Sequence, residues 1–179
     1  MLCGCNAGEK PMQNALNVRA EVLQTGGCSF TMDTTLYYEN DIYRFLMAAQ
    51  CRKDGSCEMQ ILKPASIAGI KASIDKNGGH LSYGDSVLGF EAFAGGKLAP
   101  MQLPQLFCTA LCSDYISAAN AEGEYLRATY LHGYDEDEIT VDVWFSDQTG
   151  YPEKIEVSFA GDLLMSAAIS DFEMNKGQS

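Results

Sequence analysis

This chain of 179 residues is poor in positive charge. Its 12 lysines and arginines stand against 24 acidic residues, which gives a formal net charge of −12. Proteins that bind nucleic acid need a basic surface to neutralise phosphates, so this charge argues against DNA or RNA as a partner. It also argues against electrostatic docking onto an anionic bilayer. The chain lacks any apolar run near the ~20 residues that a membrane-spanning helix requires.

Metal-binding and catalytic patterns are equally scarce. With only two histidines, His80 and His132, a zinc site would need mostly thiolates, and no two cysteines have C-x-x-C spacing. The acidic run Asp135–Glu138 lacks the spacing of a calcium loop and is interpreted as a solvated turn. No G-x-S-x-G motif is present, and no pattern places a histidine beside a nucleophile. We therefore predict no metal site, no cofactor and no catalytic residue, and expect a protein that is not an enzyme.

What the chain does have is the composition of a folded protein. Hydrophobic residues make up 46% and charged residues 20%, which is typical of a globular domain. Neither an internal repeat nor a linker interrupts the sequence. We predict a single domain over residues 11–179, preceded by a short N-terminal segment, residues 1–10.

The most apolar helical pattern lies over Leu103–Cys112. Leu103, Leu106, Phe107 and Leu111 follow the spacing of one helical face, and a proline in the first turn suits a helix start. So apolar a helix is normally covered, and strand patterns occur on both sides of it in the sequence. We predict that a sheet folds over it.

A second helix is predicted over Pro11–Gln24, ending at a Gly-Gly turn. Its apolar residues are interrupted by Arg19, whose charged end we expect to reach the edge of the packed face. The residues predicted to share that face are Met12, Ala15, Leu16, Val22 and Leu23.

The remaining chain alternates with a period of two, which predicts about eleven strands. Apolar residues on one face only are typical of antiparallel strands. The predicted strands are Cys28–Leu36, Ile42–Arg52, one from Cys57 to the proline at position 64, Ile67–Ile74, His80–Tyr83, Ser86–Phe90, Tyr115–Ala119, Tyr125–Leu131, Glu138–Phe145, Glu153–Phe159 and Leu163–Phe172.

The cysteines allow one specific pairing. Lys53-Asp54-Gly55 is a three-residue hairpin loop, and the register it implies sets Cys51 opposite Cys57. Cross-strand neighbours have Cβ atoms ~4.5–5.5 Å apart, so a disulfide is feasible in an exported protein. Two reduced core cysteines are the alternative. Cys108 and Cys112 share a helix face and are interpreted as packing residues.

The quartet Leu2-Cys3-Gly4-Cys5 matches a lipobox, the motif that precedes cleavage of bacterial lipoproteins. In that interpretation Cys5 carries the lipid, residues 6–10 form a tether, and a signal peptide belongs upstream of Met1. The protein would then be extracytoplasmic and anchored to the cell membrane. The alternative is a fortuitous pair of cysteines near the terminus.

The order of these elements resembles the LolA/LolB-like lipoprotein-carrier superfamily, in particular small lipoproteins of Gram-positive anaerobes. The resemblance spans roughly Ala15–Met174 and rests on Gly27–Thr31, Lys63–Ile70 and the terminal Asp171-Phe172. It implies an α+β fold: a curved, incomplete antiparallel β-barrel with helices packed on its concave face. It also implies that an apolar cavity holds acyl chains or lipopeptide.

The aromatic and methionine residues on one face of the predicted sheet are the candidate wall of such a cavity, together with residues of the central helix. Broad aromatic and flexible methionine side chains tolerate variable apolar ligands, although an ordinary packed core is the alternative. The candidates are Phe30, Met32, Tyr43, Phe45, Met47, Met59, Ile61, Leu106, Phe107 and Leu111. A second hypothesis is a sensor or interaction module that binds an envelope protein through the convex face, where an exposed Trp144 would favour it.

Overall fold

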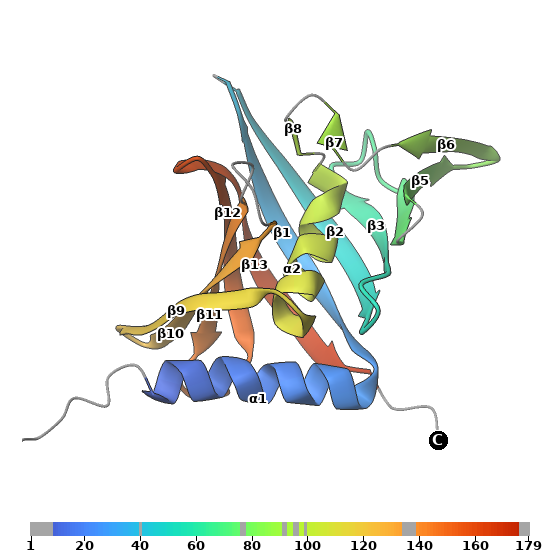
Figure 1. Ribbon diagram of the computed structural model, residues 1–179. Coiled ribbons are helices and arrows are strands. Elements are labelled where there is room, and N and C mark those ends of the chain that lie inside the picture. The colour runs from blue at the N-terminus through green and yellow to red at the C-terminus, as the bar shows by residue number, and fades with distance from the viewer. Residues whose placement is uncertain are drawn as a thin grey trace, which may run out of the picture.

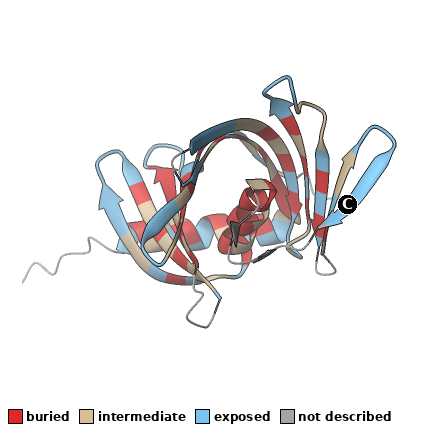
Figure 2. Ribbon diagram, turned by 90° about the horizontal axis from the view of Figure 1, so that it is seen from above, coloured by how far each residue is buried: buried red, intermediate tan, exposed pale blue. Residues whose placement is uncertain are grey.

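The computed structural model describes residues 9–39, 41–75, 78–90, 93–94, 97–98, 100–133 and 139–175. Within them, eleven strands form one antiparallel sheet in the order β6-β5-β4-β3-β2-β1-β13-β12-β11-β10-β9. The sheet is strongly curved and stays open between its edge strands β6 and β9 (Figures 1 and 2). The predicted incomplete barrel of about eleven strands is confirmed.

The elements have the following bounds. The strands of the sheet are β1 (Gly27–Tyr38), β2 (Asp41–Arg52), β3 (Cys57–Lys63), β4 (Lys71–Asp75), β5 (Gly78–Tyr83), β6 (Ser86–Phe90), β9 (Tyr115–Glu122), β10 (Tyr125–His132), β11 (Ile139–Ser146), β12 (Pro152–Phe159) and β13 (Asp162–Met174). A separate two-stranded ladder comprises β7 (Phe93–Ala94) and β8 (Lys97–Leu98). The helices are α1 (Glu9–Thr25), the 3₁₀ helix η1 (Pro100–Gln102) and α2 (Leu103–Cys112).

At the centre of the sheet, the first strand pairs with the last. Strand β1 pairs on one side with β2, its neighbour in sequence, and on the other with β13, the last strand. In every other neighbouring pair of the sheet, the two strands follow each other in the sequence. Two meanders, β2–β6 and β9–β12, therefore extend in opposite directions from the β1–β13 pair.

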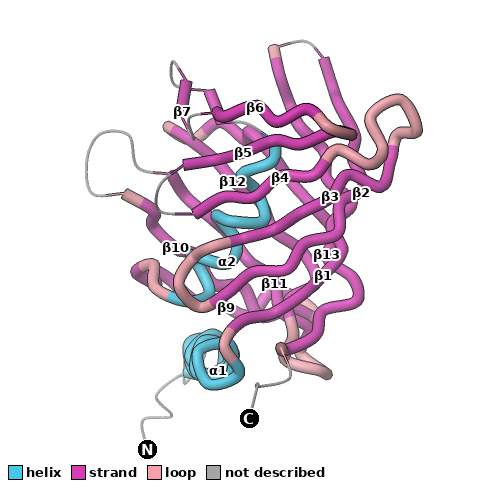
Figure 3. Tube along the Cα trace, turned by 90° about the vertical axis from the view of Figure 1, so that its right-hand side faces the viewer, coloured by secondary structure: helices cyan, strands magenta, loops and turns pink. Residues whose placement is uncertain are grey.

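Helix α2 occupies the interior of the curve, as predicted, with the predicted bounds. Its Leu103, Phe107 and Leu111 are each 0% exposed. The helix contacts β1, β2 and β3 on one side and β10 and β11 on the other. Figure 2 shows it surrounded by the sheet, and Figure 3 shows it behind the strands of β2 and β3.

Helix α1 crosses the lower end of the sheet in Figure 1 and packs on β1, β9, β10 and β13. It begins before and ends after the predicted Pro11–Gln24. The predicted packed face is partly wrong: Ala15, Val18 and Val22 are buried, while Leu16 and Leu23 are 42% and 39% exposed. The buried stripe is narrower than predicted because it follows spacings of three and four residues through Val18.

One predicted strand begins too early. The alternation over Ile67–Ile74 predicts a continuous strand, but β4 begins only at Lys71. A turn precedes it, in which the Ile67 amide donates to the Pro64 carbonyl and Gly69 adopts φ = 90°. The backbone conformation that favours glycine ends the extended stretch there.

Candidate functional site

The concave face is tightly packed around α2. Eight of the ten residues predicted to form the cavity wall are at most 6% exposed, and they belong to the hydrophobic core. Phe45 is half-buried and packs against that core, whereas Tyr43 is 45% exposed. The eight buried residues are Phe30, Met32, Met47, Met59, Ile61, Leu106, Phe107 and Leu111.

An aromatic cluster joins α2 to β1 and β13. The ring of Phe107 packs edge-on against Phe30, with centroids 4.9 Å apart, and Phe172 lies 6.3 Å from both rings. Asp171 has φ = 52°, and the pairing of β13 with β1 shifts register in the same region. This irregularity interrupts the alternation and lets the partly buried Phe172 pack against the core. The depth of the interior is therefore filled by side chains.

Burial falls off along β1 and β2 toward the hairpin that joins them. On the inner face of β2, Met47 is 0% exposed, Phe45 is half-buried and Tyr43 is 45% exposed. On β1, Leu36 lies directly opposite Tyr43 and is also only partly buried. Leu36, Tyr43 and Phe45 form an apolar rim at this end of the concave face.

Just below the rim lies Thr34, a residue that the sequence did not single out. It faces Phe45 across the β1–β2 pair and is 0% exposed. Its hydroxyl oxygen has no hydrogen-bond partner. The sequence could have pointed to Thr34, because it is a polar residue on an otherwise apolar inner face. The alternation alone does not show whether its hydroxyl has a hydrogen-bond partner.

At the opposite end of the interior, Arg19 of α1 holds the end of α2 in place. Its guanidinium donates hydrogen bonds to three carbonyl oxygens at the end of α2, those of Ala110 at 2.8 Å, Leu111 at 2.9 Å and Asp114 at 2.6 Å. A cation is favourable there because the last carbonyls of a helix lack backbone partners. The charged end of Arg19, which was expected only to reach the edge of the packed face, thus makes a specific contact between α1 and the end of α2.

Two further polar groups lie near that contact. The Nδ1 atom of His132 is 3.0 Å from an oxygen of the Asp114 carboxylate, and this hydrogen bond raises the pKa of His132 above its ordinary value. Tyr130 is fully buried, and its hydroxyl has no hydrogen-bond partner. Desolvation by burial raises the pKa of Tyr130, so the phenol stays protonated. The predicted strand began at His80, whereas β5 begins two residues earlier, at Gly78.

The cysteines gather where α2 meets the β2–β3 hairpin. Cys51 and Cys57 face each other in the register that the sequence predicts and form a disulfide, with Cα atoms 4.1 Å apart. Cys28 lies opposite Cys51 on the other side, and the sulfurs of Cys108 and Cys112 are 3.9 Å apart. The hydrogen bond with Cys108 and burial raise the pKa of Cys112, so this thiol is protonated and unreactive.

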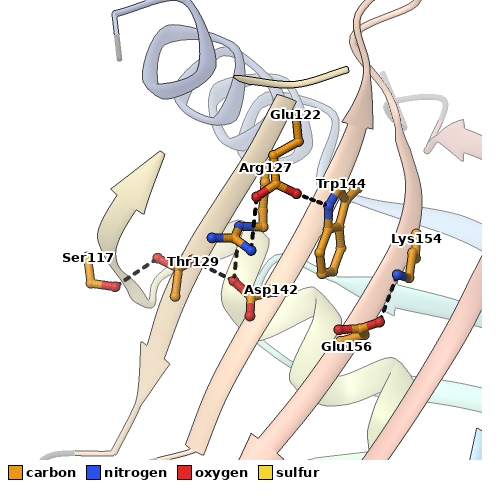
Figure 4. Close-up of polar contacts among 8 residues, drawn as sticks. All are labelled: Ser117, Glu122, Arg127, Thr129, Asp142, Trp144, Lys154 and Glu156. Carbon is orange, nitrogen blue, oxygen red and sulfur yellow. Dashed lines mark hydrogen bonds and ion pairs between the residues drawn. The ribbon is translucent and has the colours of Figure 1, made fainter. Parts of the chain in front are cut away.

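The convex face carries a polar cluster over β10, β11 and β12, shown in Figure 4. Trp144 lies within it and is only 9% exposed. Its indole nitrogen donates to the Glu122 carboxylate at 2.9 Å. The Lys154 ammonium lies 4.3 Å from its ring centre, and the Arg127 guanidinium lies 5.8 Å away. The neighbouring side chains thus cover the tryptophan.

The other members of this cluster also contact one another, although the buried Nε of Arg127 has no hydrogen-bond partner. Thr129 donates its hydroxyl hydrogen to the Asp142 carboxylate, and Ser117 donates to the Thr129 carbonyl at 3.2 Å (Figure 4). Arg127 pairs with Glu122 at 3.0 Å and approaches Asp142 at 3.8 Å. These contacts hold adjacent strands together, and they leave no activated nucleophile among the side chains drawn.

An open groove of about 460 Å³ also lies on the convex face, over β2–β5. Its floor mixes polar and apolar side chains and is open to solvent, so an acyl chain lying there would be only partly removed from water. The floor residues include Ala48, Gln50, Glu58, Gln60, Lys71 and Ser73.

Three sequence-based predictions concern metals, membrane spans and the terminal anchor. Among the described residues, no group of three or more histidine, cysteine or acidic side chains could hold a metal ion. In that same part of the chain, none of the helices combines the length and apolar character needed to span a membrane. Cys5 and the acidic run Asp135–Glu138 lie outside the described residues.

Solved structures with a similar arrangement span nearly the whole chain. A DUF1329 family protein from Desulfovibrio piger matches with a TM-score of 0.51 at 10% identity, over 98% of this chain and 96% of that one. A LolA superfamily protein from Nitrosomonas europaea matches with a TM-score of 0.48 at 9% identity, over 95% and 94%. No family model and no curated protein matches.

The fold is LolA-like. The sequence resemblance implies an open, curved antiparallel sheet with helices on its concave face. The observed sheet is open and curved, α2 lies within its curve, and α1 crosses its lower end. At 10% identity, the likeness to the Desulfovibrio piger protein concerns the fold alone.

Proposed function

We propose that this LolA-like protein binds an apolar ligand, such as an acyl chain or a lipopeptide, and is not an enzyme. The observation that carries the proposal is the rim of Leu36, Tyr43 and Phe45 on the concave face. Apolar side chains remain partly exposed there, while the neighbouring inner-face residues Met32, Thr34 and Met47 are 0% exposed. A ligand chain lying on the rim would remove both its own surface and that of the rim from water, which contributes about 0.8 kcal/mol for each buried methylene.

We further propose that the protein works outside the cytoplasm, anchored to the cell membrane by a lipid on Cys5. The Cys51–Cys57 disulfide supports an oxidising compartment, because reducing conditions keep cytosolic thiols unpaired. The anchor itself rests on the lipobox sequence. Intact-mass measurement of protein expressed with its upstream sequence restored would show a diacylglyceryl mass on Cys5, and an unmodified cysteine would refute the anchor.

An exposed tryptophan would have favoured the alternative of a protein-interaction module on the convex face. Trp144 is 9% exposed and covered by Lys154 and Arg127. That side chain is thus not available as the aromatic anchor of an interface, and we make no proposal for this face.

Thermal unfolding with added lipid tests the binding proposal. A ligand that binds only the folded state at 100 times its Kd adds about 2.7 kcal/mol of stability, which raises the Tm of a chain of this size by roughly 5–10 °C. We expect such a rise with monododecanoylglycerol. If no lipid shifts the Tm at saturating concentration, the proposal is wrong.

A pair of tyrosine variants locates the site. Tyr43→Ala removes a rim side chain, whereas Tyr115→Ala removes a tyrosine that is 69% exposed on the edge strand β9. Both should fold normally, because neither side chain belongs to the buried core. We expect Tyr43→Ala to weaken lipid binding about three- to tenfold and Tyr115→Ala to leave it unchanged. Equal effects of the two would place the ligand elsewhere.

A further inference from the structure

The hydroxyl of Thr34 is a buried polar group without a partner. Its side chain is 0% exposed, and its oxygen neither donates nor accepts a hydrogen bond. A threonine hydroxyl can do both, and burying it unpaired costs free energy comparable to a lost hydrogen bond. Valine has nearly the same shape without this cost, so packing alone does not require a hydroxyl here.

The position of Thr34 connects this hydroxyl with the proposed ligand. On the inner face of β1 it lies between Met32, which is 0% exposed, and Leu36 of the rim. Its cross-strand neighbours are Phe45 on β2 and Ala167 on β13. Thr34 therefore marks the level at which the partly exposed rim gives way to the filled interior. Because the hydroxyl has no exposed surface, a polar atom of a ligand on the rim can reach it only when the partly buried side chains of Leu36 and Phe45 turn aside.

The residues around Thr34 favour an uncharged ligand group over a charged one. The two cross-strand neighbours and the two flanking inner-face residues carry no charged group. A carboxylate would be desolvated there without a cation to pair with, which is strongly unfavourable. A neutral carbonyl oxygen is far less costly to bury and accepts one hydrogen bond from the hydroxyl.

We propose that Thr34 donates a hydrogen bond to a neutral acyl carbonyl of the ligand, in an ester or an amide. This inference rests on the proposed function and narrows the ligand class from apolar molecules in general to acyl esters and amides. A site that holds an unpaired donor discriminates against an analogue that lacks the acceptor, because binding the analogue leaves the donor unpaired.

Matched ligands and variants test this inference by isothermal titration of the full chain. The probes are monododecanoylglycerol, its ether analogue monododecylglycerol, which lacks the carbonyl, and N-dodecanoylglycinamide. The variants are Thr34→Val, which keeps the shape, and Thr34→Ser, which keeps the hydroxyl. Thr34→Ala serves as a second variant without the hydroxyl, in case Thr34→Val fails to fold. We expect Thr34→Val to have at least the Tm of the wild type, because it loses an unpaired polar group.

The wild type should bind the ester about three- to tenfold more tightly than the ether. This preference should fall to about one in Thr34→Val and persist in Thr34→Ser. Tighter binding of the ester than of the amide would identify a glycerolipid as the source of the carbonyl, and the reverse an N-acyl peptide.

Two results overturn the inference while leaving lipid binding intact: equal wild-type affinity for ester and ether, or an ester preference that survives in Thr34→Val. Failure of the wild type to bind any of the three probes would instead refute the proposed function itself. The two failures are therefore distinct.

Discussion

Replacing Arg19 should destabilise the protein more than replacing any exposed arginine. Its guanidinium donates to the carbonyls of Ala110, Leu111 and Asp114 at 2.6–2.9 Å, and these contacts tie α1 to the end of α2. In Arg19→Met the apolar stem is kept, and the three carbonyls lose a charged donor.

The magnitude follows from these contacts. A hydrogen bond to a charged group contributes about 1.5–3 kcal/mol, and a cation at a helix C-terminus contributes about 0.3–1 kcal/mol. Three bonds from one side chain are not additive, and water can reach the half-buried site and replace some of them. We therefore expect a loss of about 2–3 kcal/mol in the free energy of unfolding.

Urea unfolding monitored by circular dichroism measures this loss, with the free energy extrapolated linearly to water. Arg52→Met is the matched control, because Arg52 makes a surface ion pair with Glu58 and its side chain is 54% exposed. It should cost at most about 1 kcal/mol. Arg19→Lys should recover only part of the loss, since an ammonium cannot reproduce the planar arrangement of donors. A cost for Arg19→Met no larger than that for Arg52→Met would refute the reasoning.

Two further predictions concern the other polar contacts. The Asp114 carboxylate raises the pKa of His132. This pair should therefore stabilise the fold fully below about pH 6.5 and lose its effect as the pH rises through the folded-state pKa. A difference in unfolding free energy between wild type and His132→Gln that does not shrink over this range would contradict the assignment. The Cys51–Cys57 disulfide closes a short loop, so replacing both cysteines by alanine should cost about 2 kcal/mol from the unfolded-state entropy. Reductant should then lower the urea midpoint of the wild type and leave that of the double variant unchanged.

Local patterns in the sequence were sufficient where neighbouring residues determine the structure. The bounds of α2 follow from its apolar spacing and from Pro104 in the first turn. The pairing of Cys51 with Cys57 follows from a short loop in which Gly55 takes φ = 82°. The turn before β4 was missed because Ile67 and Ile70 are β-branched residues typical of strands, yet they pack against the core from a turn.

Features set by distant residues could not be predicted in this way. Arg19 finds its carbonyl partners more than 90 positions along the chain. Trp144 alternates outward as expected, but its cover comes from Arg127 on β10 and Lys154 on β12. The sequence shows Thr34 on an apolar face, whereas only the packed fold reveals that nothing pairs with its hydroxyl.

The pairing of β1 with β13 also has a consequence for biosynthesis. The strand that leaves the ribosome early acquires its second neighbour only when the final strand has been made, while the two meanders can form from local contacts beforehand. Until then β1 presents an unsatisfied row of backbone groups, which is a template for pairing with another chain. The last thirteen-residue strand, Asp162–Met174, thus completes the sheet at its middle, and nascent chains that lack it should be the form most prone to aggregate.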